Sequence, residues 1–461
     1  MANNLRDKVV AAFKGFIRTY KLLPVKERDL IEESEYVGTF QLFRSETEWS
    51  RLFYKKRSYR RLIDLVDRLF HGQTDSKFVS RCLEQVATEW IEQGYSTDDQ
   101  ARLEQSAADF LEKVEQGIKD RVLHVPVEGL KFGSRQDLQL AKCQLCHNHP
   151  DSELMKAVRQ DRKRFSRESE EFDEHYSSVE QAPAFFRVSV SGHSGRATQR
   201  STEEVDLALN VLRFFLGSFY FDIYRQPSTP RRMGIVGTLP TIGPHSNVFF
   251  AQADVPIEEQ FPGMSVQYKH LKLFELDYRK IENLNNNSIL IRINQLLSSL
   301  ETGSGTDVAR RLLRTVNWFG KASTASSIAE SFLMYAISVE ALLSEGQTRK
   351  ETYAKQIATL VIRHDSKGLY PFGGYLSSKF NGRLSKASCK KDRFTIVNDR
   401  VVELFSYRND VAHGRVLENE IEPVNLLDLE TLVRNSILSF VDGGWDTLEQ
   451  FKVWLNQNLP Q

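Results

Sequence analysis

Residues 393–415, RFTIVNDRVVELFSYRNDVAHGR, carry the pattern of one helix and its end. Apolar side chains recur there every three or four residues, as in an amphipathic helix that packs one face inward: Phe394, Val397, Val401, Leu404 and Val411. The same spacing places Arg408 on the buried face, and His413 comes directly before Gly414. Since glycine commonly ends helices, we predict a helix with a guanidinium on its packed side and an imidazole at its tip.

A second charged residue interrupts an apolar pattern earlier in the chain. In SFLMYAISVEALL, residues 331–343, Glu340 is the only charge in a run that we expect to be buried almost all round. An unpaired charge in such surroundings costs several kcal/mol, so it needs a partner or a purpose. We therefore expect Glu340 to meet Arg408 and to fix its guanidinium. On spacing alone, a buried ion pair that only sets helix register is the competing interpretation.

His413 adds a group that the ion pair does not explain. The carboxyl end of a helix carries a partial negative charge, which favours a protonated imidazole. Such a histidine is well placed for proton transfer, although a lone histidine there is usually just a good helix end. Arg408 and His413 are five residues apart and subtend about 140° on a helix. They converge only through the reach of the arginine, a loosened last turn or a partner subunit.

Arg408, Asn409 and His413 form the pattern R-N-x-x-x-H, which resembles the signature of HEPN domains. The run FLMYAISVEALL, residues 332–343, resembles the earlier helix of the same family, and YRNDVAHG resembles its "RNdiaHG" form. With a strand-rich region upstream, the chain resembles the Apea-like HEPN group of bacterial proteins. The resemblance covers about residues 307–441 and is weaker over 119–300.

The resemblance implies a helical bundle that dimerises so that two motifs face each other, and a metal-independent endoribonuclease that needs no cofactor. Arg408 and His413 would then be catalytic, and Asn409 would position the phosphate or the facing motif. Glu340, Asp410 and Tyr407 would support the site, with Tyr407 either stacking on a base or simply packing. The implied partners are RNA, including tRNA, and a second copy of the chain. Antiviral defence or a toxin role, with a viral or other trigger, follows by analogy.

The rival interpretation is a non-catalytic module that binds RNA or nucleotides or holds a dimer together. In that interpretation the motif is a polar network at the dimer interface. A purely structural pair accounts for Arg408 and Glu340, but it leaves Asn409 and His413 as coincidence. The residues therefore favour the enzyme.

Composition limits the other classes of function. The 461 residues contain 62 Lys and Arg against 61 Asp and Glu, so no overall positive charge draws the chain to nucleic acid or membrane. Any polyanion site must be local, and basic runs such as KKRSYRR at 55–61 are more often solvated helix faces. The start of the chain lacks the layout of a secretory signal and no apolar run approaches a membrane span, so we expect a cytoplasmic protein with reduced thiols.

Length and local pattern predict an α+β multidomain fold that is predominantly helical. We expect a helical N-terminal region at 1–118, a mixed α/β domain at 119–302 that senses a trigger or positions RNA, and a C-terminal all-α HEPN-like bundle at 303–461. In the middle domain we predict a strand at 184–192 and a helix at 201–217 that begins with a capping box and ends at Gly217. The predicted C-terminal helices are 307–319, 326–344, 350–363, 393–413, 424–441 and 445–457.

Two further motifs carry weaker signals. KCQLCHNHP, residues 142–150, sets Cys143 and Cys146 at the spacing of a zinc knuckle, with His147 and His149 adjacent. A closed zinc site wants four ligands, and no second pair follows nearby, so an ordinary strand and loop is the better interpretation. SGHSGR, residues 191–196, lacks both the Walker and the dinucleotide-binding spacing, so we interpret it as a turn.

Overall fold

The computed structural model describes residues 2–19, 21–24, 36–44, 49–133, 136–165, 180, 182–216, 234–235, 274–300, 306–325, 327–343, 349–365, 377–417 and 420–459. It confirms the predicted class, because the chain is mostly helical with a small antiparallel sheet in its N-terminal half and a helical C-terminal region. None of the helices among these residues is long and apolar enough to cross a membrane.

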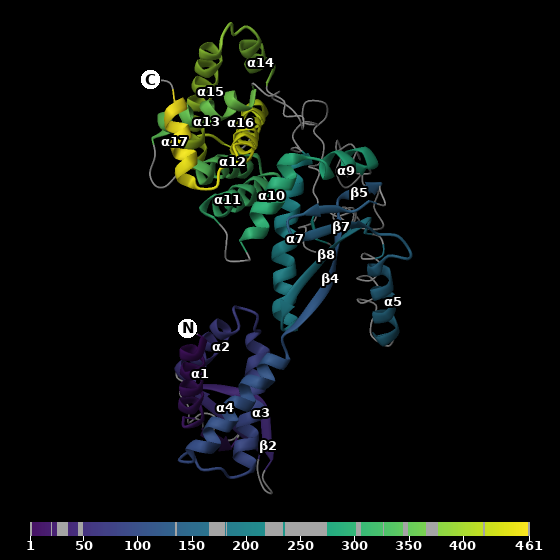
Figure 1. Cartoon of the computed structure of the whole chain (residues 1–461), viewed down its shortest axis with the longest axis vertical. Coiled ribbons are helices and arrows are strands. Elements are labelled where there is room, and N and C mark those ends of the chain that lie inside the picture. The colour runs from purple at the N-terminus through teal and green to yellow at the C-terminus, as the bar shows by residue number, and fades with distance from the viewer. Residues whose placement is uncertain are drawn as a thin grey trace, which may run out of the picture. The chain divides into compact units, whose positions relative to one another are not determined.

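The chain divides into two units (Figure 1). The N-terminal unit comprises residues 1–123 and 189–201, and the second unit comprises residues 124–188 and 202–461. The predicted division into three domains at 118 and 302 stays a prediction.

Among its described residues, the N-terminal unit contains four complete helices and a sheet that was not predicted. The helices are α1 (Ala2–Ile17), α2 (Lys56–Leu69), α3 (Ser76–Glu92) and α4 (Gln100–Gln116). Their apolar faces form one core, in which the rings of Phe13 and Phe110 stack with centroids 5.4 Å apart. Strands β1 (Lys21–Pro24), β3 (Trp49–Lys55) and β2 (Tyr36–Arg44) form an antiparallel sheet in that order. The prediction of an all-helical region at 1–118 is therefore wrong for these three segments.

The turn predicted at 191–196 is confined to His193, because residues 191–192 end a strand and a helix begins at Ser194. Strand β8 (Ala184–Gly192) ends before it and helix α7 (Ser194–Leu216) begins after it. The buried imidazole accepts a hydrogen bond from the backbone N–H of Asp75 at its Nδ1 (3.0 Å) and donates from Nε2 to the Val114 carbonyl (2.8 Å). It thereby ties this turn to the start of α3 and to α4.

The second unit contains a five-stranded sheet with the order β6-β7-β8-β4-β9. Its strands are β6 (Leu138–Leu140), β7 (Cys143–His147), β8, β4 (Lys119–Glu128) and β9 (Gly234–Ile235), and the pairs β6–β7, β7–β8 and β4–β9 are antiparallel. Strand β10 (Phe274–Asp277) pairs with β5 (Leu130–Gly133) in parallel. Helix α5 (Glu153–Phe165) follows β7 in the chain.

The predicted start of the helix at 201 is wrong, because α7 begins at Ser194. Ser201 is buried and its Oγ donates to the Thr198 carbonyl (2.7 Å), so its hydroxyl bonds inside the helix and does not cap it. The predicted end at Gly217 lies outside the described residues.

The C-terminal helices match the predicted ones closely. They are α11 (Asp307–Ala322), α12 (Ile328–Leu343), α13 (Lys350–Asp365), α15 (Lys390–Ala412), α16 (Pro423–Asp442) and α17 (Leu448–Asn458), preceded by α9 (Tyr278–Asn285) and α10 (Ser288–Ser299). Helix α14 (Ser378–Ser385) begins in the second half of the Gly-rich segment 364–383 and ends just after it. Thr306 caps α11 by accepting from the Ala309 N–H (3.3 Å).

Helix α16 is the centre of this bundle (Figure 1). Its residues 426–441 are all buried, and it contacts α10, α12, α13 and α15. Helix α15 packs on both α12 and α13, and this packing brings the C-terminal end of α15 beside α12. The arrangement therefore places Arg408 within reach of Glu340.

Candidate functional site

The candidate site lies at the C-terminal end of α15, where the chain forms a Schellman motif. The N–H of Arg415 bonds to the Asp410 carbonyl (2.8 Å), and the N–H of Gly414 bonds to the Val411 carbonyl (3.1 Å). Gly414 has a φ of +66°, a conformation that side chains with a Cβ rarely adopt. His413 is the last residue before this turn and is exposed. The predicted helix end is present, with the imidazole next to the carboxyl end of the helix.

The predicted ion pair between Arg408 and Glu340 is also present. Arg408 Nη2 lies 3.0 Å from Glu340 Oε2, and Arg408 Nη1 donates to Asn409 Oδ1 at 3.2 Å. The two charged side chains are 27% and 23% exposed, so the prediction that both are buried is wrong. The end of a helix gives its side chains less cover than its middle does, and the guanidinium therefore has a route to solvent.

The guanidinium is not fully satisfied in this state. Among the described residues, its buried Nε has no hydrogen-bond acceptor. An unsatisfied buried donor costs about 1–3 kcal/mol, and such atoms are uncommon in folded proteins. Arg408 is thus held by one carboxylate and one amide while one of its donors has no acceptor.

Burial changes the acidity of the supporting carboxyl. It raises the pKa of Glu340 above its ordinary value of 4.5, and the charge of Arg408 opposes this rise. An acid whose pKa is raised by folding contributes stability that is fully present below its unfolded pKa and is lost as the pH rises through its folded pKa.

We therefore predict that the stability of the wild type relative to Glu340→Gln falls as the pH rises from about 4 through this raised pKa. Urea unfolding of both proteins at a series of pH values measures this difference. A difference that does not change with pH, or that grows with pH, would contradict the assignment.

The other predicted residues take different positions around the helix end. Tyr407 packs edge-on against Phe332 of α12, with ring centroids 5.6 Å apart, and its hydroxyl donates to the Glu420 carbonyl at 3.2 Å. Of its two predicted roles, the structure therefore shows packing. Asp410 pairs with the exposed Arg415 at 3.2 Å, and Asn409 is exposed.

The weak zinc candidates do not converge. Cys143 and Cys146 are three residues apart in β7, so their side chains point to opposite faces of the strand. Cys146 packs with Leu154, Val158 and Phe185, and His149 accepts from the Asp151 N–H at 3.2 Å. Among the described residues, no group of three or more His, Cys, Asp or Glu side chains is placed to hold a metal ion.

This burial leads to a prediction about thiol reactivity. Burial raises the pKa of both Cys143 and Cys146 to about 12, and Cys82 is buried as well. Because the thiolate is the reactive form, we expect a thiol reagent to modify only the exposed Cys389 quickly in the native protein. In denaturant all four cysteines should react. More than one fast thiol in the native protein would contradict the placement of β7 or α3.

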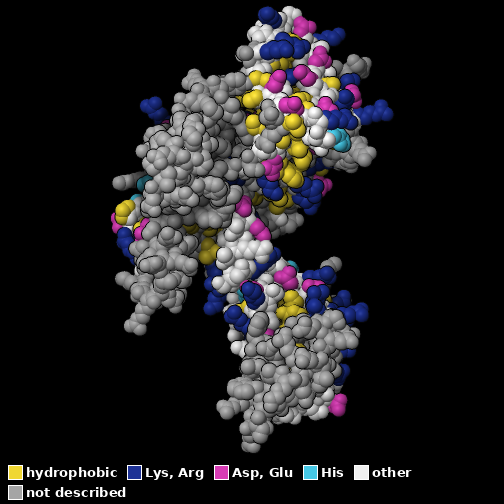
Figure 2. Space-filling model, turned by 180° about the vertical axis from the view of Figure 1, so that it is seen from behind, with side chains coloured by type: hydrophobic (Ala, Val, Ile, Leu, Met, Phe, Trp, Pro, Cys, Tyr) yellow, Lys and Arg dark blue, Asp and Glu magenta, His cyan; other side chains and the backbone are white. Residues whose placement is uncertain are grey.

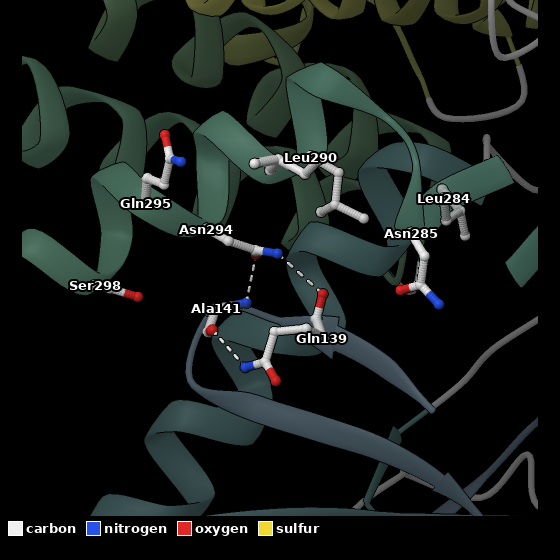
Figure 3. A pocket seen from close by; sticks show the side chains of 9 residues that line it. Gln139, Ala141, Leu284, Asn285, Leu290, Asn294, Gln295 and Ser298 are labelled. Carbon is white, nitrogen blue, oxygen red and sulfur yellow. Dashed lines mark hydrogen bonds between the residues drawn. The ribbon is translucent and has the colours of Figure 1, made fainter. Parts of the chain in front are cut away.

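A pocket of about 410 Å³ lies where α9 and α10 meet the β6–β7 hairpin (Figure 3). Four side-chain amides line it, from Gln139, Asn285, Asn294 and Gln295. The amide of Asn294 accepts from the Ala141 N–H (2.6 Å) and donates to the Gln139 carbonyl (3.0 Å). The Asn294 side chain thus occupies backbone hydrogen-bonding groups at the edge of the sheet, next to strand β6. No titratable residue is among the described residues that line the pocket, so we interpret it as a packing interface between the helices and the hairpin and not as a catalytic site.

A buried ion pair that the sequence analysis missed joins three elements of the bundle. Asp428 of α16 is fully buried and accepts from Arg400 of α15 at Nε (2.9 Å) and Nη2 (2.8 Å). The same carboxylate accepts from the backbone N–H and the hydroxyl of Ser377, the residue that caps α14. This network holds α15, which carries the candidate site, against α16.

Comparison of the chain with family models, with curated proteins and with solved structures finds no match. The resemblance to HEPN domains therefore stays a prediction, carried by residues 332–343 and 407–414.

Proposed function

We propose that this protein is a metal-independent endoribonuclease that cuts RNA at the Arg408–His413 motif. The observation that carries the proposal is the pairing of two features within one turn and a half of α15. One is an arginine that is held by Glu340 yet still partly exposed. The other is an exposed histidine at a helix end that is fixed by Gly414.

The chemistry of RNA cleavage matches these side chains. The ribose 2′-hydroxyl attacks the adjacent phosphorus, the bond from phosphorus to the 5′-oxygen breaks, and a 2′,3′-cyclic phosphate remains. No metal ion or protein nucleophile is needed for this step, but the substrate must be RNA. The reaction needs a cation for the charge that builds up on phosphate oxygens, and groups that take one proton and give one.

Arg408 is suited to the first task, because a guanidinium can contact two phosphate oxygens at once. His413 is suited to the second, either by taking the proton of the 2′-hydroxyl or by protonating the leaving 5′-oxygen. One motif supplies one histidine, whereas the reaction uses an acid and a base. A two-fold dimer in which two motifs face each other would supply both, with Asn409 positioning the phosphate or the facing motif.

The biological setting of the proposal comes from the same resemblance. We propose a cytoplasmic bacterial ribonuclease that acts in antiviral defence or as a toxin, with RNA such as tRNA as its substrate. The N-terminal 302 residues would sense the trigger or position the RNA.

The test is incubation of the purified full-length protein with tRNA and total RNA in EDTA, followed by separation of the products on a denaturing gel. Discrete fragments are the expected result. The same assay is run with added lysate from virus-infected cells, so that a protein that needs a trigger is also detected. Intact RNA under both conditions would contradict the proposal.

A second candidate function is a non-catalytic RNA-binding or dimerisation module. The observation in its favour is that Arg408 already has two internal partners, Glu340 and Asn409. Binding of RNA without cleavage under both conditions would support this alternative.

A further inference from the structure

The N-terminal unit contains a surface cavity of about 560 Å³ that is formed by α3, α4 and the start of β4. Of the described residues that line it, four carry a positive charge and the others are uncharged. The cations are Arg81, Lys113, Lys119 and Arg121, and the others are Phe78, Cys82, Gln85, Gln116 and Gly117. The volume lies in the range of about 300–1,000 Å³ that is typical of small-molecule sites.

The walls of this cavity are held in place by close packing. A Cβ at position 117 would lie 2.5 Å from the ring of Phe78, so the glycine lets the end of α4 approach α3. The buried His193 contacts the Phe78 ring, with centroids 4.1 Å apart, and hydrogen-bonds to the backbones of Asp75 and Val114. The cavity is therefore formed before any ligand arrives.

The charge inside the cavity is unbalanced. No carboxylate is among the described residues that line it. Lys113 pairs with the exposed Glu89 at 2.9 Å, and Arg121 donates from Nε to the Gly192 carbonyl at 3.4 Å. Arg81 and Lys119 are exposed and form no ion pair with any described residue. Several cations around one hollow favour a ligand that carries more than one negative charge.

We propose that this cavity binds the phosphate groups of a nucleotide ligand, either a free nucleoside polyphosphate or RNA. The two arginines offer forked donors that fit phosphate oxygens, and the two lysines add charge. Gln85 and Gln116 can hydrogen-bond a sugar or a base, and the half-buried ring of Phe78 offers an apolar wall for a base. This proposal does not depend on RNA cleavage at Arg408 and His413.

The test uses the full-length protein in EDTA with two probes. ATP binding is measured by isothermal titration calorimetry. Binding of a short fluorescein-labelled single-stranded RNA is measured by anisotropy, and its riboses carry 2′-O-methyl groups so that the proposed ribonuclease cannot cut it. The cavity variant is Arg81→Gln with Lys119→Gln, because both side chains are exposed and neither forms a hydrogen bond with a described residue. Circular dichroism and melting temperature check that each variant is folded.

A charge-matched control is needed, because Lys and Arg side chains are spread over the described surface of this unit (Figure 2). The control is Arg57→Gln with Arg60→Gln, which removes the same charge from exposed positions of α2 that do not line the cavity. We expect the cavity variant to bind at least about tenfold more weakly than the wild type, and the control to stay within about threefold.

The outcomes separate the sources of the phosphate. A loss that affects ATP identifies a nucleotide site, and a loss that affects only the labelled RNA identifies an RNA contact. The proposal is overturned if neither probe binds the wild type at about 1 mM, or if the cavity variant and the control weaken binding equally. ATP binding does not require cleavage at Arg408 and His413, so a failure here is distinct from a failure of the proposed ribonuclease.

Discussion

The His413→Ala variant is expected to cleave RNA about 10²–10⁴-fold more slowly than the wild type while keeping the wild-type melting temperature. The imidazole is exposed, and the helix end is maintained by backbone bonds of Gly414 and Arg415 that do not involve it. Its removal should therefore affect proton transfer and leave the fold intact. Cleavage rates from a time course on the responsive RNA, with a thermal melt of each protein, measure both effects.

His149→Ala is the matched control for this experiment. It removes an exposed imidazole that lies in the second unit but outside the motif. Equal cleavage by His413→Ala and the wild type would exclude His413 as the acid or base. Equal loss in both histidine variants would point to a general effect on the protein.

The Asp428→Ala variant is expected to lower the free energy of unfolding by about 3–5 kcal/mol. The substitution leaves the guanidinium of Arg400, whose side chain is 10% exposed, without the Asp428 oxygen that accepts from both its Nε and its Nη2. It also removes the acceptor for the backbone N–H of Ser377 at the start of α14. Unfolding in guanidinium chloride, followed by far-ultraviolet circular dichroism, measures the loss.

The control removes the other carboxylate that touches the same arginine. Glu403 lies 2.9 Å from Arg400 Nη1 but is 64% exposed, so Glu403→Gln should change the free energy of unfolding by less than about 1 kcal/mol. Similar losses from Asp428→Ala and Glu403→Gln would contradict the view that burial sets the cost.

The C-terminal helices could be predicted from the sequence because their apolar spacing is regular and their ends are marked. Thr306 and Asp307 mark the start of α11, and Gly414 marks the end of α15. The pairing of Glu340 with Arg408 was also predictable, because a charge inside an apolar helix needs a partner. The exposure of that pair was not, since helical spacing indicates a face and not its depth at a helix end.

Asp428 is also a charge inside a largely apolar helix and needs a partner, yet that partner could not be named in advance. Helix α16 is buried on all sides, so its apolar pattern does not indicate which neighbour covers which face. Arg400 lies 28 positions earlier, and only the packing of α15 on α16 brings the two together. The sheet of β1, β3 and β2 was missed because the β-propensity of a segment depends on what its strand packs against, whereas helical patterns can be predicted from local spacing.

The chemical form of the fragment ends shows whether the ribose 2′-hydroxyl is the attacking group and whether His413 takes part. Wild type and His413→Ala are incubated with the same RNA in EDTA, and the fragments are assayed for 2′,3′-cyclic phosphate at their 3′ ends. We expect cyclic phosphate ends at discrete positions from the wild type and a loss of about 10²–10⁴-fold in their yield from His413→Ala. Fragments with 3′-hydroxyl ends, or equal yields of cyclic ends from both proteins, would contradict this expectation.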